Sequence, residues 1–267
     1  MTMVLLCTGI LVALAAAARS TYSPCGLSML SSITPFGERA RRHRYRVTAA
    51  WFVAGALLGG ATLGAVSAGL AALVGSVVGT GPWTYATAAA LTAAAALIDA
   101  GAFGPVLPLI RRQVDDRWLA RYRPWVYGAG FGWQIGVGVA TYLMTAGVLV
   151  VVALGVLSGS PLLAWSLGVV FGAARGVTVF LTAGASSAAE LRVLHGRLAA
   201  AGAAVQRGLA GLLAGAAVGL AICAYLAGSA LAPGLGAAVA GLGAVTGAVV
   251  GAASTSLGRA VAAGPVP

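Results

Sequence analysis

The chain carries very little charge for its length. Of its 267 residues only 5 are acidic and 16 are basic, charged residues make up 8%, and the mean hydropathy is +0.97. A soluble domain carries roughly 25% charged residues, so these few charges cannot cover a water-soluble globule of this size. The composition excludes that class and predicts an all-α, polytopic integral membrane protein that uses the lipid bilayer as its solvent.

Lysine and asparagine are absent altogether. All 16 basic residues are arginine, and glycine alone accounts for 40 positions. Because Lys and Asn use A-rich codons, their absence indicates a GC-rich bacterial genome. The net charge of +11 lies in short connections between apolar runs, which is typical of a protein oriented in a membrane. We therefore expect no nucleic-acid partner.

Long apolar runs predict about seven transmembrane helices, because one crossing needs about 20 such residues. The predicted spans are 3–33, 47–78, 84–110, 125–157, 162–183, 209–231 and 234–257. The first and fourth are longer than a crossing needs and contain helix-breaking sequences, Ser23-Pro24 in one and Gly128, Gly130 and Gly132 in the other. We expect both helices to be interrupted, which a bilayer tolerates where the exposed backbone faces protein or a cavity.

The arginines predict how the protein is oriented. Most of the 16 arginines lie in every second connection: five in 36–46, five in 111–123, three in 184–208 and one in the C-terminal tail. The three connections between these hold none. Arginine-rich connections stay in the cytoplasm. The pattern predicts a multi-pass protein of the bacterial cytoplasmic membrane, with its N-terminus outside and its C-terminus in the cytoplasm.

The spans suggest an internal repeat. Residues 3–110 and 125–231 each hold three predicted spans that begin with an interrupted one, and an odd number of spans would invert the second copy. Inverted repeats with interrupted helices are typical of transporters, whose site lies at the repeat interface. We expect a single transmembrane domain over 1–267, with an inverted three-plus-three repeat and an extra C-terminal helix at 234–257.

Glycines four residues apart recur in three of the spans. These glycines are Gly55, Gly59, Gly60 and Gly64, then Gly211, Gly215 and Gly219, then Gly243, Gly247 and Gly251. Small residues at this spacing let helix backbones approach closely. They predict tight packing within the chain, and the last helix could instead form a homodimer.

Three ionisable residues fall inside predicted spans, namely Arg19, Asp99 and Arg175. Buried charges in a bilayer are costly and mark functional sites by default. Asp99 and Arg175 could form a structural ion pair. Arg19 would suit an anionic substrate, a lipid headgroup or a nearby thiolate, so the three form a candidate substrate-binding or charge network.

The three cysteines give no metal or cofactor signature. No CxxC and no Cys/His ligand spacing occurs, so we expect neither a metal nor a cofactor. Cys7 and Cys223 suit buried packing positions. Cys25 follows Pro24 at the expected helix break, where a helix N-terminus and a guanidinium favour the reactive thiolate.

The segment Ser23-Pro24-Cys25-Gly26-Leu27-Ser28-Met29-Leu30 resembles the first-span signature of the CcdA family and of the related transmembrane domain of DsbD. Those proteins carry reducing equivalents from thioredoxin to thiol acceptors outside the cell, using one Cys from each repeat. The resemblance implies Cys25 as a redox thiol, Pro24 as the residue that shapes the helix around it, and a thioredoxin-like partner.

The second repeat departs from that signature, because Phe131 stands where the partner Cys would be. Three functions therefore remain open. The first is a thiol–disulfide carrier or accessory that works through Cys25, with Cys223 or a partner's cysteine as the second thiol. The second is a small-solute transporter or exporter on a CcdA-like scaffold, and the third is a non-catalytic membrane subunit.

Overall fold

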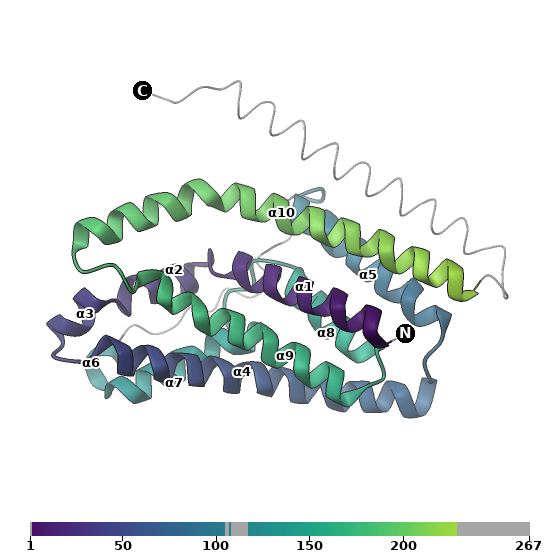
Figure 1. Ribbon diagram of the computed structural model, residues 1–267, viewed down its shortest axis with the longest axis horizontal. Coiled ribbons are helices and arrows are strands. Elements are labelled where there is room, and N and C mark those ends of the chain that lie inside the picture. Colours follow the sequence, from purple (N-terminus) through teal and green to yellow (C-terminus); the bar gives the residue numbers. More distant parts are fainter. Residues whose placement is uncertain (1, 105–106, 108–116, 229–267) are drawn as a thin grey trace, which may run out of the picture.

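The chain folds into α-helices, and no strand occurs in the part that the structure describes (Figure 1). The computed structural model describes residues 2–104, 107 and 117–228. The helices are α1 (Thr2–Ser20), α2 (Pro24–Ser32), α3 (Pro35–Ala40), α4 (Tyr45–Leu73), α5 (Pro82–Ala100), α6 (Trp118–Arg121), α7 (Pro124–Val137), α8 (Gly147–Leu157), α9 (Pro161–Val177) and α10 (Ala188–Gly228). A π-helical turn, Val74–Val78, extends α4, and a 3₁₀ turn, Thr178–Thr182, extends α9.

Within the described residues, four helical segments are long and apolar enough to cross a membrane. They are Met3–Ser20, Tyr45–Val78, Pro161–Thr182 and Ala188–Gly228. The predicted class, an all-α polytopic membrane protein, is confirmed. The predicted span 234–257, and the homodimer contact assigned to it, lie outside the described residues.

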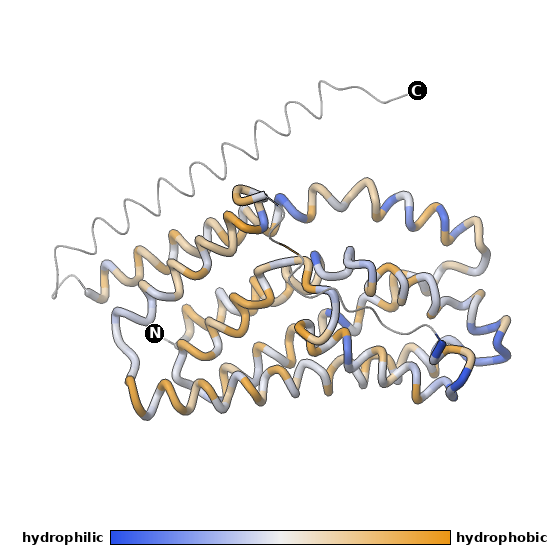
Figure 2. Tube along the Cα trace, turned by 180° about the vertical axis from the view of Figure 1, so that it is seen from behind, coloured by the Kyte–Doolittle hydropathy of each residue, from blue (hydrophilic) through white to orange (hydrophobic). Residues whose placement is uncertain are grey.

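The hydrophilic residues gather at one end of the helix bundle (Figure 2). That end contains α3, α6 and the first turns of α10, whereas the end near the N-terminus is mostly apolar. The arginine-rich connections around Arg41 and Arg121 therefore share one end of the molecule, which agrees with a charge asymmetry across a membrane.

The first span is interrupted where the sequence predicts. α1 ends at Ser20 and α2 begins at Pro24, with Ser23 as its N-cap. The Ser23 hydroxyl accepts a hydrogen bond from the Gly26 N–H at 3.1 Å. Proline lacks an N–H and suits the first position of a helix, so a new helix starts here.

The second interruption lies elsewhere than predicted. Gly128, Gly130 and Gly132 lie inside α7, and the break falls at residues 138–146. Gly138 ends α7 with a φ of 72°, a left-handed conformation that glycine adopts without a steric penalty. The prediction placed the break at the wrong glycines.

Glycines join α4 to its neighbours. A Cβ atom at Gly132 of α7 would overlap the carbonyl oxygen of Phe52, and one at Gly172 of α9 would lie 2.7 Å from the Cα atom of Gly60. The predicted close packing is therefore confirmed for α4. At Gly211, Gly215 and Gly219 no described atom lies within 4 Å of a Cβ position, so close packing there stays a prediction.

Two helix boundaries also differ from the prediction. α5 ends at Ala100 rather than near 110, because Gly101 caps it with a φ of 80°. α10 begins at Ala188, so most of the expected connection 184–208 is helical. A reciprocal cap starts α10, in which the Glu190 N–H bonds to the Ser187 hydroxyl and the Ser187 N–H bonds to the Glu190 carboxylate. Such a cap satisfies two N–H groups at a helix start.

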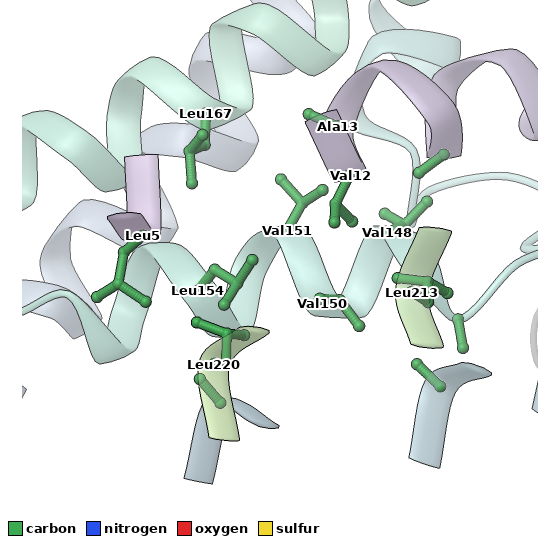
Figure 3. Close-up of a cluster of buried hydrophobic side chains, with 14 of the residues drawn as sticks. Leu5, Val12, Ala13, Val148, Val150, Val151, Leu154, Leu167, Leu213 and Leu220 are labelled. Carbon is green, nitrogen blue, oxygen red and sulfur yellow. The ribbon is translucent and has the colours of Figure 1, made fainter. Parts of the chain in front are cut away.

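The main apolar core lies where α1, α8, α9 and α10 meet (Figure 3). Leu5 and Val12 of α1 pack with Leu154 of α8, Leu167 of α9 and Leu213 of α10. α8 is therefore enclosed by other helices, which fixes the position of its N-terminus. That N-terminus carries part of the candidate site.

Candidate functional site

Three helices stop or start part-way along the molecule (Figure 1). α1 ends at Ser20, α5 ends at Ala100 and α8 begins at Gly147, whereas α4 and α10 run along most of the bundle. Hydrogen bonds join the end of α5 to the start of α8 directly, and the end of α1 to α5 through Gln206 of α10. Helix ends carry backbone N–H and C=O groups that have no hydrogen-bond partner within their own helix. These groups are thus brought together inside the protein.

Asp99, at the end of α5, binds the start of α8. Its carboxylate accepts hydrogen bonds from the Thr145 hydroxyl at 2.6 Å and from the Ala146 N–H at 2.9 Å. A carboxylate at a helix N-terminus satisfies N–H groups and complements the helix dipole. Asp99 therefore binds the polar groups that the second interruption exposes at the start of α8.

Arg19 completes this group from α1. Its guanidinium donates to the side-chain oxygen of Gln206 at 3.1 Å, and the Gln206 amide donates to the backbone oxygen of Asp99 at 2.9 Å. Arg19 and Asp99 also interact electrostatically. The expected pair between Asp99 and Arg175 does not form, because Asp99 faces Arg19 instead.

Cys25 lies at the start of α2, one residue after Pro24, and its side chain is only 1% exposed. The N–H groups of the first turn point out of the N-terminus of a helix and give it a partial positive charge. The site residue that the sequence predicts is thus at a helix N-terminus, as expected. Its guanidinium neighbour is a different one from the Arg19 expected.

Arg175 is the arginine beside Cys25. It lies in the last turn of α9, is 2% exposed and interacts electrostatically with Cys25. Its Nε atom has no hydrogen-bond partner in the part of the chain that the structure describes. Arg175 and Gly26 line a cavity of about 10 Å³, roughly the space of one water molecule.

The other two cysteines do not approach Cys25. All three are thiols rather than disulfides. Cys7 is thirteen residues before the end of α1, about 20 Å along the helix, and Cys223 interacts with Tyr85 in the first turns of α5.

Phe131, which stands where the partner Cys would be, is fully buried and stacks on Trp118 with ring centroids 5.7 Å apart.

A second buried acid, Glu38, was missed by the sequence analysis. Glu38 is 0% exposed and accepts hydrogen bonds from Tyr127 at 2.7 Å, Thr48 at 2.6 Å and Arg41 at 2.8 Å. His43 Nδ1 lies 3.8 Å from the same carboxylate. These bonds join α3, α4 and α7 at the basic end.

The signal for Glu38 was present in the sequence. It is the one acid in an arginine-rich segment that was interpreted as a solvated connection. Thr34-Pro35 marks a helix start just before it, and the Thr34 hydroxyl accepts from the Gly37 N–H at 2.9 Å. A lone acid in the first turn of a short helix among arginines points to a paired carboxylate.

Comparison with known proteins finds two distant bacterial homologues. The chain is 29% identical over 150 residues to the methylamine utilization protein MauF of Methylorubrum extorquens, covering 53% of this chain and 50% of that protein. It is 33% identical over 171 residues to MauF of Paracoccus versutus, covering 62% of this chain and 61% of that protein. The chain thus spans between half and about three fifths of the curated relatives it matches. No protein-family profile and no solved structure matches it. The chain is a multi-pass membrane protein distantly homologous to MauF proteins.

Proposed function

We propose that this protein is a membrane thiol–disulfide accessory that works through Cys25. One observation carries the proposal: the buried Arg175 lines the same small cavity as Gly26, the neighbour of Cys25 at the N-terminus of α2. The nucleophile in thiol–disulfide exchange is the thiolate, and cations and helix N-termini favour it. A buried cation whose Nε has no partner is costly, and a thiolate would offset part of that cost.

The partner of Cys25 belongs to another protein in this proposal, since Cys7 and Cys223 lie toward the other end of the bundle. The Cys25 thiolate attacks one sulfur of a partner's disulfide, which forms a mixed disulfide and releases the partner's other sulfur as a thiolate. A thioredoxin-like dithiol then displaces the partner from Cys25, and its second thiolate releases Cys25. Two electrons pass from the dithiol to the partner's disulfide.

Three further features belong to this proposal. The interruptions before α2 and before α8 support an inverted repeat, and the basic end supports an N-terminus outside and a cytoplasmic C-terminus. The two relatives are named for methylamine utilization, which supports an accessory role in a bacterial pathway of that kind.

The test is to trap Cys25 in native membranes. Cells are quenched in acid and alkylated, and their membranes are run on a non-reducing gel. We expect a mixed-disulfide band that disappears in Cys25→Ser and persists in Cys7→Ser and Cys223→Ser. A band that survives in Cys25→Ser, or the absence of any band in the wild type under oxidant, would contradict the proposal.

A further inference from the structure

A polar cavity of about 400 Å³ lies where α1, α5 and α8 meet α10. This volume falls in the range of pockets that bind small ligands. Its polar lining includes Arg19, Asp99, Tyr142 and Gln206. Cys25 is not among its lining residues, so the cavity is distinct from the thiol site.

Arg19 is the cation of this cavity and is held in place. Its side chain is 9% exposed, and Gln206 fixes it through a hydrogen bond of 3.1 Å. A guanidinium has five N–H donors. Arg19 interacts electrostatically with Asp99, but no ion pair within 4.0 Å joins it to an acid among the residues described here, so its guanidinium can still donate to an anion.

Asp99 does not compete for that role as a ligand-binding group. Both of its oxygens already accept hydrogen bonds, one from Thr145 and one from the Ala146 N–H. Its backbone oxygen accepts from Gln206. Asp99 therefore orients α8 and Gln206, and the charged donors among the described lining residues are those of Arg19.

The rest of the described lining is apolar. Ile98 and Met144 line the cavity together with Gly101, Gly104 and Leu107. Both glycines have positive φ angles, 80° and 72°, so larger side chains would be strained there. Ile98 and Met144 offer apolar contacts to a short hydrocarbon chain beside the cation.

We propose that this cavity binds a small organic monocarboxylate, with its carboxylate on Arg19 and its short apolar chain against Ile98 and Met144. Arginine binds carboxylates through paired, charge-assisted hydrogen bonds. An anionic ligand bound to Arg19 would also offset the cost of placing this cation in the bilayer.

The test uses the whole protein in lipid nanodiscs and isothermal titration with three probes of one size: butyrate, butyramide and butylammonium. We expect butyrate to bind at least tenfold more tightly than the other two. Equal binding of butyrate and butyramide, tighter binding of butylammonium, or no binding of butyrate would overturn the proposal. This comparison needs only the wild-type protein.

Variants then locate the site. Arg19→Gln should weaken butyrate binding at least tenfold, and Arg19→Lys should retain part of it. Arg207→Gln is the matched control, because Arg207 is partly exposed on α10, does not line the cavity and bonds to the backbone of Ala203. Cys25→Ser should bind butyrate normally, which separates this site from the proposed thiol exchange. If Arg207→Gln weakens binding as much as Arg19→Gln does, or if dodecanoate binds tenfold more tightly than butyrate, a short-chain site on Arg19 is wrong.

Discussion

At Cys25, the chemistry depends on a residue that is distant in the sequence. The thiol is placed by the Ser23 cap and by Pro24, but the cation beside it comes from α9. In the low dielectric of a protein interior, one nearby charge changes the balance between thiol and thiolate strongly. Arg175 should therefore control the reactivity of Cys25 more than any feature of its own helix.

This gives a prediction for Arg175→Gln. The reaction of Cys25 with the small reagent methyl methanethiosulfonate should slow about tenfold, because the cation beside the thiol is lost. Arg175→Lys keeps the positive charge and should react more nearly like the wild type. Equal slowing in Arg175→Gln and Arg175→Lys would show that the charge of Arg175 is not what matters for Cys25.

Glu38 supports a second prediction at this scale. Tyr127→Phe removes one donor from a fully buried carboxylate, and a hydrogen bond to a charged group contributes about 1.5–3 kcal/mol. We expect the free energy of unfolding in mixed micelles to fall by that amount. Tyr225→Phe, at a half-exposed position of α10, should leave stability nearly unchanged, and an equal loss in both would contradict the assigned role of Glu38.

Among the elements, α4 is held by backbone contact with α7 and α9 rather than by large side chains. Gly132 and Gly172 face backbone atoms of α4, whereas Gly219 of α10 faces open space in the described structure. Glycine is poor for helix stability in itself. At the first two positions its small size outweighs that cost, because tighter packing between helices is what stabilises association in lipid.

Paired alanine substitutions should separate these two roles of glycine. Gly132→Ala places a methyl group against the carbonyl oxygen of Phe52 and should lower the free energy of unfolding by about 1–3 kcal/mol. Gly219→Ala should leave it unchanged or raise it by up to about 1 kcal/mol. Unfolding in mixed micelles measures both, and destabilisation by Gly219→Ala instead would show that α10 is packed on that face.

The elements also show which features the sequence could predict. Ser23-Pro24 combines a cap with a residue that starts helices, and both act locally, so the first break was predicted correctly. Gly128, Gly130 and Gly132 permit either a break or close packing, and contact with α4 decides between them. The depth of a residue in a span gives its position along the helix axis but not the direction it faces. For that reason an ion pair between Asp99 and Arg175 was considered, although in the structure Asp99 bonds to the start of α8 and interacts with Arg19.

For the whole molecule, the strongest asymmetry is that of charge. The basic segments around Arg41, Arg121 and Arg197 belong to one end of the bundle, and the apolar turns near Thr80 and Ser160 belong to the other (Figure 2). The charge asymmetry favours the proposed orientation, in which the arginine-rich end faces the cytoplasm. The proposed thiol exchange depends on this orientation, because α2 extends from the interrupted region toward the basic end.

Single cysteines in a protein without native cysteines test the orientation. The cysteine-free background combines Cys7→Ser, Cys25→Ser and Cys223→Ser. When Thr80→Cys is added to this background, the new cysteine should react with an impermeant maleimide added to intact cells. Ser186→Cys, in the connection before α10, should react only after the cells are opened, because it lies at the basic end. Both turns lie outside the apolar spans, so their reactivity reports the side of the membrane rather than burial in lipid. The opposite labelling pattern would place the basic end outside, and the cytoplasmic dithiol would then have to reach Cys25 from the apolar end of the bundle.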